Sequence, residues 1–321
     1  MRDLRALPKA HLHLHLTGSM RPDTLAEWAA RDGLRLPEPL PPDRVHGWAD
    51  FQGRYDLARA VIRSAGDVVR VVREAATADA ADGAGWLELQ VDPTSYAARL
   101  GSLEDVVAAV LAGAAEAPIP VGVVVAASWG ATAEHAERLA RLAAATPGVI
   151  GFGLSNDERL GRVGDFVAAC RLAADAGLRI VPHAGFYEPA AHVRDCVELL
   201  GAHRVGHAVT AASCPETLGL LAGRQVAVEL CPTSYPPLGV AWDLSALLDA
   251  GVPVALGTDD PLLFGVGLAG QYQIARDLGC DDATLARLAR DSITHSAAPA
   301  EVRGGLLAGV DAWWAGAGPD E

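Results

Sequence analysis

Three histidines alternate with leucines near the start of the chain, at His11, His13 and His15. A β-strand sends alternate side chains to one face, so the three imidazoles would share a face. At about 3.3 Å per residue the outer two would stand roughly 13 Å apart, too far to bind one ion. At most two neighbours can therefore share a metal ion. His13 and His15 are the better pair because they lie nearer the end of the strand.

Other polar residues that suit metal or acid–base chemistry stand where further strands are expected to end. They are Asn156-Asp157-Glu158, His183, His207 and Thr258-Asp259-Asp260. In a barrel of parallel strands, such ends converge on one face. Four histidines and an aspartate gathered there would form a nitrogen and oxygen site, suited to zinc or a similar divalent ion with an open position for water.

The elements that must position these residues follow an alternating pattern. Short apolar or β-branched runs alternate with Ala-, Leu- and Arg-rich segments of helical period, which is typical of repeated βα units. The expected strands are Ala10–His15, Trp86–Val91, Val121–Ala126, Val149–Leu154, Arg179–His183, Arg204–His207, Gln225–Leu230 and Val252–Thr258. The expected helices include Leu103–Glu116, Ala133–Ala145, Asp165–Ala176, Ala190–Leu200 and Leu244–Ala250. The sequence therefore predicts an α/β fold, a (β/α)8 TIM-type barrel forming a single domain over residues 1–321.

The first crossover is longer than the others and is interrupted by the Pro-rich stretch Leu36–Pro42. We expect residues 20–82 to form a helical insertion over the mouth of the barrel. Phe51 and Tyr55 lie four residues apart within it, on one face of a helix. This pair either covers a flat ring as part of a lid or packs into the core.

Composition restricts the class of partner. The chain has 321 residues, half of them apolar, and a net charge of −14, which argues against nucleic acid or an anionic membrane surface as a partner. A small molecule is the expected ligand. No leader is recognisable and no apolar run reaches about 18 residues, so a cytoplasmic protein is expected. Five cysteines without a C-x-x-C motif indicate reduced thiols. The sequence leaves open whether the chain forms a homo-oligomer.

Several segments, in this order, resemble the adenosine and adenine deaminase group of the metal-dependent amidohydrolase superfamily. They are Pro8–Gly18, His183-Ala184-Gly185, Val205-Gly206-His207, Cys231-Pro232-Thr233-Ser234 and Thr258-Asp259-Asp260-Pro261. The resemblance implies a (β/α)8 barrel with one zinc ion held by His13, His15, His183 and Asp259. His207 would orient or deprotonate the attacking water with help from Asp259, and Asp260 would share a hydrogen bond with a purine ring nitrogen.

The chain departs from that family pattern around the substrate. Phe186 stands where the family has a glutamate that protonates a ring nitrogen, so Glu188, or less readily Tyr187, would have to replace that acid. Thr17 replaces an aspartate that contacts ribose, and Asn156 replaces a glycine whose backbone approaches the purine. The expected substrate contacts are His15, Thr17, Phe51, Tyr55, Asn156, Phe186 and Asp260.

Three functions are compatible with these residues. The first is a zinc-dependent hydrolytic deaminase of an adenine-like base, nucleoside or modified nucleoside, in which zinc-activated water attacks the amine-bearing carbon and ammonia leaves. The second is a zinc-dependent amidohydrolase that cleaves an amide, imine or cyclic C–N bond and needs no ring-nitrogen protonation. The third is a degenerate family member that binds a metal or a purine without turnover. Its intact ligand positions argue against the third.

Overall fold

Eight parallel strands in chain order form one continuous sheet in the computed structural model, which describes residues 1–37 and 44–316. The strands are β1 (Lys9–His15), β2 (Ala84–Val91), β3 (Val121–Ser128), β4 (Val149–Ser155), β5 (Arg179–Ala184), β6 (Arg204–His207), β7 (Ala227–Leu230) and β8 (Val254–Leu256). The segment after β8 returns to β1, where the Asp259 N–H donates to the His13 carbonyl over 3.1 Å and the His15 N–H donates to the Asp259 carbonyl over 3.2 Å. The predicted (β/α)8 barrel is confirmed.

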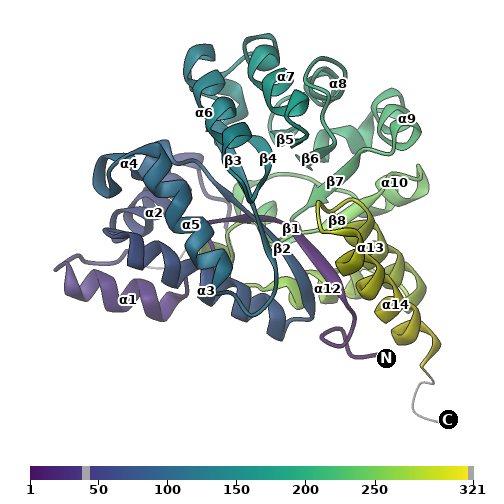
Figure 1. Cartoon of the computed structure of the whole chain (residues 1–321). Helices are drawn as coiled ribbons and strands as arrows, with labels where there is room; N and C mark the ends of the chain where they lie inside the picture. Colours follow the sequence, from purple (N-terminus) through teal and green to yellow (C-terminus); the bar gives the residue numbers. More distant parts are fainter. Residues whose placement is uncertain (38–43, 317–321) are drawn as a thin grey trace.

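Helices follow the strands and surround the barrel (Figure 1). They are α1 (Pro22–Arg31), α2 (Trp48–Ala60), α3 (Ala65–Ala81), α4 (Thr94–Leu100), α5 (Leu103–Ala115), α6 (Ala133–Ala145), α7 (Val167–Asp175), α8 (Ala190–Leu199), α9 (Pro215–Arg224), α10 (Leu244–Asp249), α11 (Pro261–Phe264), α12 (Leu268–Asp277), α13 (Asp282–Thr294) and α14 (Ala300–Ala315). Because each helix runs back between parallel strands, the carboxyl ends of the strands share one face of the barrel.

Some predicted boundaries differ from the observed ones for local reasons. The strand expected from Gln225 begins at Ala227, because Gln225 has a left-handed φ of 52° at the end of α9 and cannot extend a strand. The strand expected over Val252–Thr258 is regular only over Val254–Leu256. The helix expected from Asp165 begins as a 3-10 turn over Val163–Phe166 before α7.

Three helices, α1, α2 and α3, occupy the insertion between β1 and β2. Helix α3 packs beside α5 on the barrel wall, whereas α2 contacts α11, the short helix after β8. The expectation of an insertion over the mouth therefore applies to α2 and not to α3. Residues 38–43, which include most of the Pro-rich stretch, and residues 317–321 lie outside the described residues.

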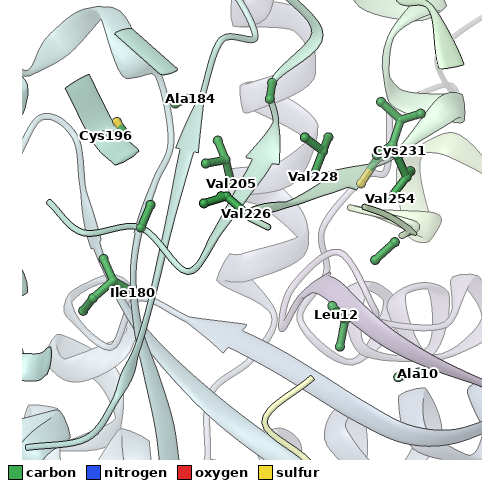
Figure 2. Packing of buried hydrophobic residues seen from close by; sticks show 14 of the residues in the cluster. Ala10, Leu12, Ile180, Ala184, Cys196, Val205, Val226, Val228, Cys231 and Val254 are labelled. Carbon is green, nitrogen blue, oxygen red and sulfur yellow. The ribbon is translucent and has the colours of Figure 1, made fainter. Parts of the chain in front are cut away.

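The apolar core lies between the strands and the helices. Figure 2 shows Val205, Val228 and Val254 of neighbouring strands, and all three are fully buried. Burying each such side chain contributes roughly 1.5–3 kcal/mol, so this layer holds the strand ends in fixed positions. All five cysteines are free thiols, as predicted. Within the described ranges, no helix is both long and apolar enough to cross a membrane.

Candidate metal centre and active site

The histidines and the aspartate expected to hold a metal meet at the carboxyl end of the barrel. One donor atom each from His13, His183, His207 and Asp259 lies within 4.8 Å of the other three. His15 joins this group, because its Nε2 lies 3.1 Å from His183 Nε2 and 3.3 Å from Asp259 Oδ1. Residues from β1, β5, β6 and the segment after β8 thus converge on one point.

The backbone is left-handed where several of these side chains leave their strands. His207, the last residue of β6, has a φ of 68°, and Asp259 has a φ of 60°. Asn156, directly after β4, has a φ of 72°. Asn, Asp and His tolerate this region better than most residues, and its small cost is typical of functional sites. Each strand therefore ends at, or just before, the residue that faces the site.

A network of buried charged side chains orients the His13 ring. The His13 Nδ1–H donates to Glu229 Oε2 over 2.8 Å, and Arg204 Nε–H donates to Glu229 Oε1 over 2.6 Å. Arg204 also contacts Glu88, and all three charged residues are almost completely buried. The His183 Nδ1–H donates to the Leu154 carbonyl over 2.7 Å. In both imidazoles Nδ1 is thus used in a hydrogen bond, and Nε2 is the atom that can bind a metal ion. Metal-binding histidines usually show this arrangement.

Burial favours the neutral form of His183 and His207, the form that can bind a metal ion, whereas neighbouring carboxylates favour the charged form of His13. Burial, with the neighbouring charges of His13 and His15, lowers the pKa of His183 well below its usual range. Burial also lowers the pKa of His207 to about 3, although Asp259 opposes this shift. For His13, burial favours the neutral ring, but the neighbouring carboxylates of Asp259 and Glu229 outweigh it and raise the pKa to about 10. His13 Nε2 is buried and lies 3.5 Å from Asp259 Oδ1.

This donor set fits a divalent ion with a preference for imidazole and carboxylate ligands. The ligands implied by the family resemblance were His13, His15, His183 and Asp259. The group of four donor atoms within 4.8 Å of one another contains His207 and not His15. All five residues lie close enough to share the site, which leaves one of them available to act on water or substrate.

A cavity adjoins the centre. Its lining combines candidate metal-site residues with residues from α2, α4 and the ends of β2, β4 and β5. The residues are His15, Leu16, Trp48, Phe51, Gln52, Tyr55, Arg59, Gln90, Val91, Asp92, Ser95, Tyr96, Ser155, Asn156, Asp157, Glu158, His183, Phe186, Tyr187, His207, Leu238, Asp259 and Asp260. A cavity with mixed apolar and polar walls is typical of a small-molecule site.

Aromatic side chains of α2 form one wall of the cavity. Phe51 stacks on Phe264 of α11 with the ring centroids 5.7 Å apart and the planes 5° from parallel. Trp48 meets Tyr187 edge-on with the centroids 6.2 Å apart. Phe51 and Tyr55 both line the cavity, as a lid would require. Helix α2 is thereby joined to the loops that follow β5 and β8.

Phe186 places a ring where the family pattern has an acid. Its centroid lies 4.8 Å from that of His207 and 5.7 Å from that of Tyr235. Tyr187 lines the cavity beside Phe186, but burial raises its pKa, while Arg159 opposes this shift. The half-buried Glu188 is not among the cavity-lining residues.

The remaining predicted substrate contacts divide into two groups. Asn156 and Asp260 line the cavity, and burial together with the adjacent charge of Asp259 raises the pKa of Asp260 well above its usual range. A Cβ at Gly18 would stand 1.8 Å from Asp260 Oδ1, so glycine is required in the turn after β1. Thr17 does not line the cavity, and its hydroxyl lies 2.5 Å from that of Tyr96, which does.

Sequence reasoning assigned no role to several residues of the site. Glu158 Oε1 accepts the backbone N–H groups of Tyr187 and Glu188 over 2.5 and 2.6 Å, so it holds the loop that carries Phe186. The position of Glu158 just after β4 was the feature of the sequence that could have indicated this role. Glu229 could have been predicted because it lies on the inward-facing side of β7. Arg59 had no such signal, because its position depends on how α2 lies against the barrel.

A (β/α)8 barrel whose strand ends gather imidazoles and an aspartate in one cavity defines a metal-dependent hydrolase of the amidohydrolase class. Residues 8–313 match the family model for adenosine deaminase. The chain belongs to the adenosine deaminase family.

Similar proteins agree with this assignment. A putative adenosine/adenine deaminase of Streptomyces coelicolor is 51% identical, and the match covers 98% of each chain. An aminodeoxyfutalosine deaminase of Acidothermus cellulolyticus is 32% identical over 88% of this chain and 86% of that protein. The crystal structure of an N6-mAMP deaminase from Arabidopsis matches with a TM-score of 0.86 and 26% identity, covering 96% of this chain and 99% of that one. The chain is therefore an enzyme of the hydrolytic deaminases, which act on C–N bonds other than peptide bonds.

Proposed function

We propose that this chain is a zinc-dependent hydrolytic deaminase of an adenine-like base, nucleoside or modified nucleoside. Water would add to the amine-bearing carbon, and the C–N bond would break to give the oxo product and ammonia. The convergence of His13, His183, His207 and Asp259 beside a cavity lined by Asp260 carries this proposal. The similar proteins, which are named for adenosine, adenine and modified adenine substrates, support the same substrate class.

Each polar residue of the site has a task in this reaction. His13, His15, His183 and Asp259 would hold the zinc ion, which when bound supplies Lewis-acid activation of water. His207 is neutral and borders the same centre, so it can accept the proton that the attacking water loses. Asp260 borders the cavity with an unpartnered Oδ1 and can share a hydrogen bond with a purine ring nitrogen.

Protonation of the ring nitrogen needs a donor other than Phe186. Glu188 and Tyr187 are the two proposed replacements, and Glu158 fixes the backbone of both. Tyr187 already lines the cavity, whereas Glu188 would have to turn its carboxyl toward it. A carboxyl is the stronger acid of the two, because burial raises the already high pKa of Tyr187.

One observation favours a second candidate function. Phe186 packs edge-on against His207, so the site offers an apolar surface where ring protonation would occur. Hydrolysis of an amide, imine or cyclic C–N bond does not need that proton. The second candidate is therefore a zinc-dependent amidohydrolase with such a substrate.

Metal analysis and product assays on the zinc-loaded enzyme test these proposals. Release of ammonia would be measured for adenine, adenosine and AMP, release of methylamine for N6-methyladenosine, and the hydrolysed product by chromatography for pterins and cyclic amides. We expect release of the amine from at least one aminopurine, and loss of that activity in Glu188→Gln or, if the phenol is the donor, in Tyr187→Phe. Deamination that persists in both variants would contradict the proposed acids. Turnover confined to cyclic amides would favour the second candidate over the first.

A further inference from the structure

The cavity that adjoins the candidate metal centre extends to residues of two helices outside the barrel strands. His15, His183, His207 and Asp259 line the part where the reacting ring would lie. Tyr55 and Arg59 of α2, with Ser95 and Tyr96 of α4, line the same cavity. A substituent on the base can therefore contact these side chains.

Arg59 is the only arginine or lysine among the described residues that line this cavity. Its guanidinium lies 4.8 Å from the centroid of the Tyr55 ring, and one terminal nitrogen donates to Asp56 Oδ1 over 2.9 Å. Its Nε–H is buried and has no hydrogen-bond partner in the described structure. A buried N–H group without a partner carries a desolvation cost, so an acceptor on a ligand would stabilise this one.

Three residues with hydroxyl groups, Tyr55, Ser95 and Tyr96, line the same cavity as Arg59. Burial raises the pKa of Tyr96, while the positive charge of Arg59 opposes that shift, which places the guanidinium near the phenol. Phenol and serine O–H groups can donate to an anion together with a guanidinium.

Three carboxylates, of Asp56, Asp92 and Asp260, lie near enough to interact with the charge of Arg59. Asp56 forms an ion pair with a terminal nitrogen of Arg59 and is more than half exposed. Asp92 Oδ1 accepts the backbone N–H of Thr94 over 2.9 Å. Burial raises the pKa of Asp92, and hydrogen bonds from Thr94 oppose this shift. None of the three carboxylates satisfies the Arg59 Nε–H in the described structure.

We propose that the substrate carries an anionic group, a phosphate or a carboxylate, away from its reacting amine, and that Arg59 binds this group through its guanidinium. The hydroxyls of Tyr55, Ser95 and Tyr96 complete the subsite. This inference rests on the proposed deaminase function, because the base at the metal centre fixes which end of the ligand reaches Arg59. The substrate class is then an aminopurine derivative with an acidic substituent.

The test compares anionic and neutral aminopurines that share the same base. Deamination of adenosine, AMP and adenosine 5′-carboxylate by the zinc-loaded wild-type enzyme would be measured as kcat/KM. We expect an anionic compound to exceed adenosine by roughly 10- to 100-fold, the usual effect of a hydrogen bond to a charged group. Whether AMP or the carboxylate gains more identifies which anion the subsite accepts.

Two variants test whether Arg59 causes the preference for the anionic substrate. Arg59→Gln should reduce the ratio of anionic to neutral kcat/KM by roughly 10-fold or more, while Arg59→Lys retains part of the ratio because it keeps the charge. Arg54→Gln is the matched control, since Arg54 lies on the same helix but does not line the cavity. It should leave the ratio at the wild-type value.

Calorimetric binding of IMP and inosine provides a readout that does not depend on turnover. Wild-type protein should bind IMP more tightly than inosine, and Arg59→Gln should remove most of this difference. Inosine 5′-carboxylate tests the carboxylate in the same way. Equal affinity for inosine and both anionic ligands, or an equal loss for all three in Arg59→Gln, would overturn the inference. If Arg59→Gln does not fold, the wild-type preference must still weaken with added salt. Absence of ammonia from every aminopurine would overturn the proposed function, while the IMP and inosine affinities would still decide the role of Arg59.

Discussion

Glu229 links the candidate metal centre to the barrel floor, because it accepts hydrogen bonds from both His13 and Arg204. Glu229→Gln would keep the shape of the side chain but weaken its hold on the His13 ring. Loss of such a partner typically costs 10- to 100-fold in metal affinity, and we expect a reduction of about that size. Competition with a chromophoric chelator measures it. Glu216→Gln, an exposed carboxylate on α9, is the control, and equal zinc affinity in both variants would contradict this role.

Glu158 acts on the loop that carries Phe186 and not on the metal centre. Glu158→Ala would leave the part-buried N–H groups of Tyr187 and Glu188 without this acceptor, and we expect a loss of about 1–3 kcal/mol in total. Glu158→Gln keeps one acceptor oxygen, so its free energy of unfolding should stay closer to the wild-type value. Urea denaturation of the three proteins measures the difference. If both variants lose the same stability, the hydrogen bonds to the loop are not the reason for the loss.

At the scale of elements, a reciprocal cap fixes the start of α3, the last helix of the insertion between β1 and β2. Ser64 Oγ accepts the Asp67 N–H over 3.1 Å, and Asp67 Oδ2 accepts the Ser64 N–H over 3.1 Å. Ser64→Ala should lower the free energy of unfolding by about 1 kcal/mol. Thr77→Ala, at an exposed position inside the same helix, should cost nothing because alanine has the higher helix propensity. Urea denaturation curves test the pair, and similar losses in both would argue against the cap.

The sequence predicted the strands and the candidate metal ligands together, because both predictions depend on local rules. Alternation of apolar and polar residues placed His13 and His15 on one face, and the end of β5 placed His183 beside them. The helical spacing of Phe51 and Tyr55 indicated a possible lid, and both residues line the cavity. The stacking of Phe51 on Phe264 and the place of Arg59 in the cavity could not be predicted, because they depend on how α2 folds back over the barrel. Contacts between segments so far apart in the sequence produce no local pattern of apolar and polar residues from which they could be predicted.

At the scale of the whole molecule, Lys9 joins three separate parts of the fold. Its Nζ donates to the Leu4 carbonyl over 2.8 Å and to the Asp82 carbonyl over 2.7 Å, and it lies 5.3 Å from the Tyr272 ring centroid. Lys9 is the only lysine in the sequence and is completely buried. The segment before β1, the end of α3 and helix α12 therefore meet at one ammonium group.

The burial of Lys9 makes the stability of the molecule depend on pH. Burial lowers the pKa of Lys9 from 10.5 to about 8, although Asp82 and Asp79 oppose the shift. Between these two values the unfolded chain binds more protons than the folded one, so this contribution to the free energy of unfolding rises with pH. Relative to Lys9→Met, the wild-type protein should gain up to about 3 kcal/mol across that window and nothing below it.

Two measurements test this prediction. Urea denaturation of wild-type protein and Lys9→Met at a series of pH values gives the difference in free energy of unfolding, in which the other titrating groups cancel. Because the sequence contains a single lysine, selective 13C labelling of lysine also gives one NMR resonance, whose titration should have its midpoint near pH 8. A midpoint at the ordinary lysine value, with a pH-independent difference in stability, would show that the ammonium is well solvated or fully compensated by Asp82 and Asp79. In that case Lys9 would join the three segments by its hydrogen bonds alone, without a pH-dependent term.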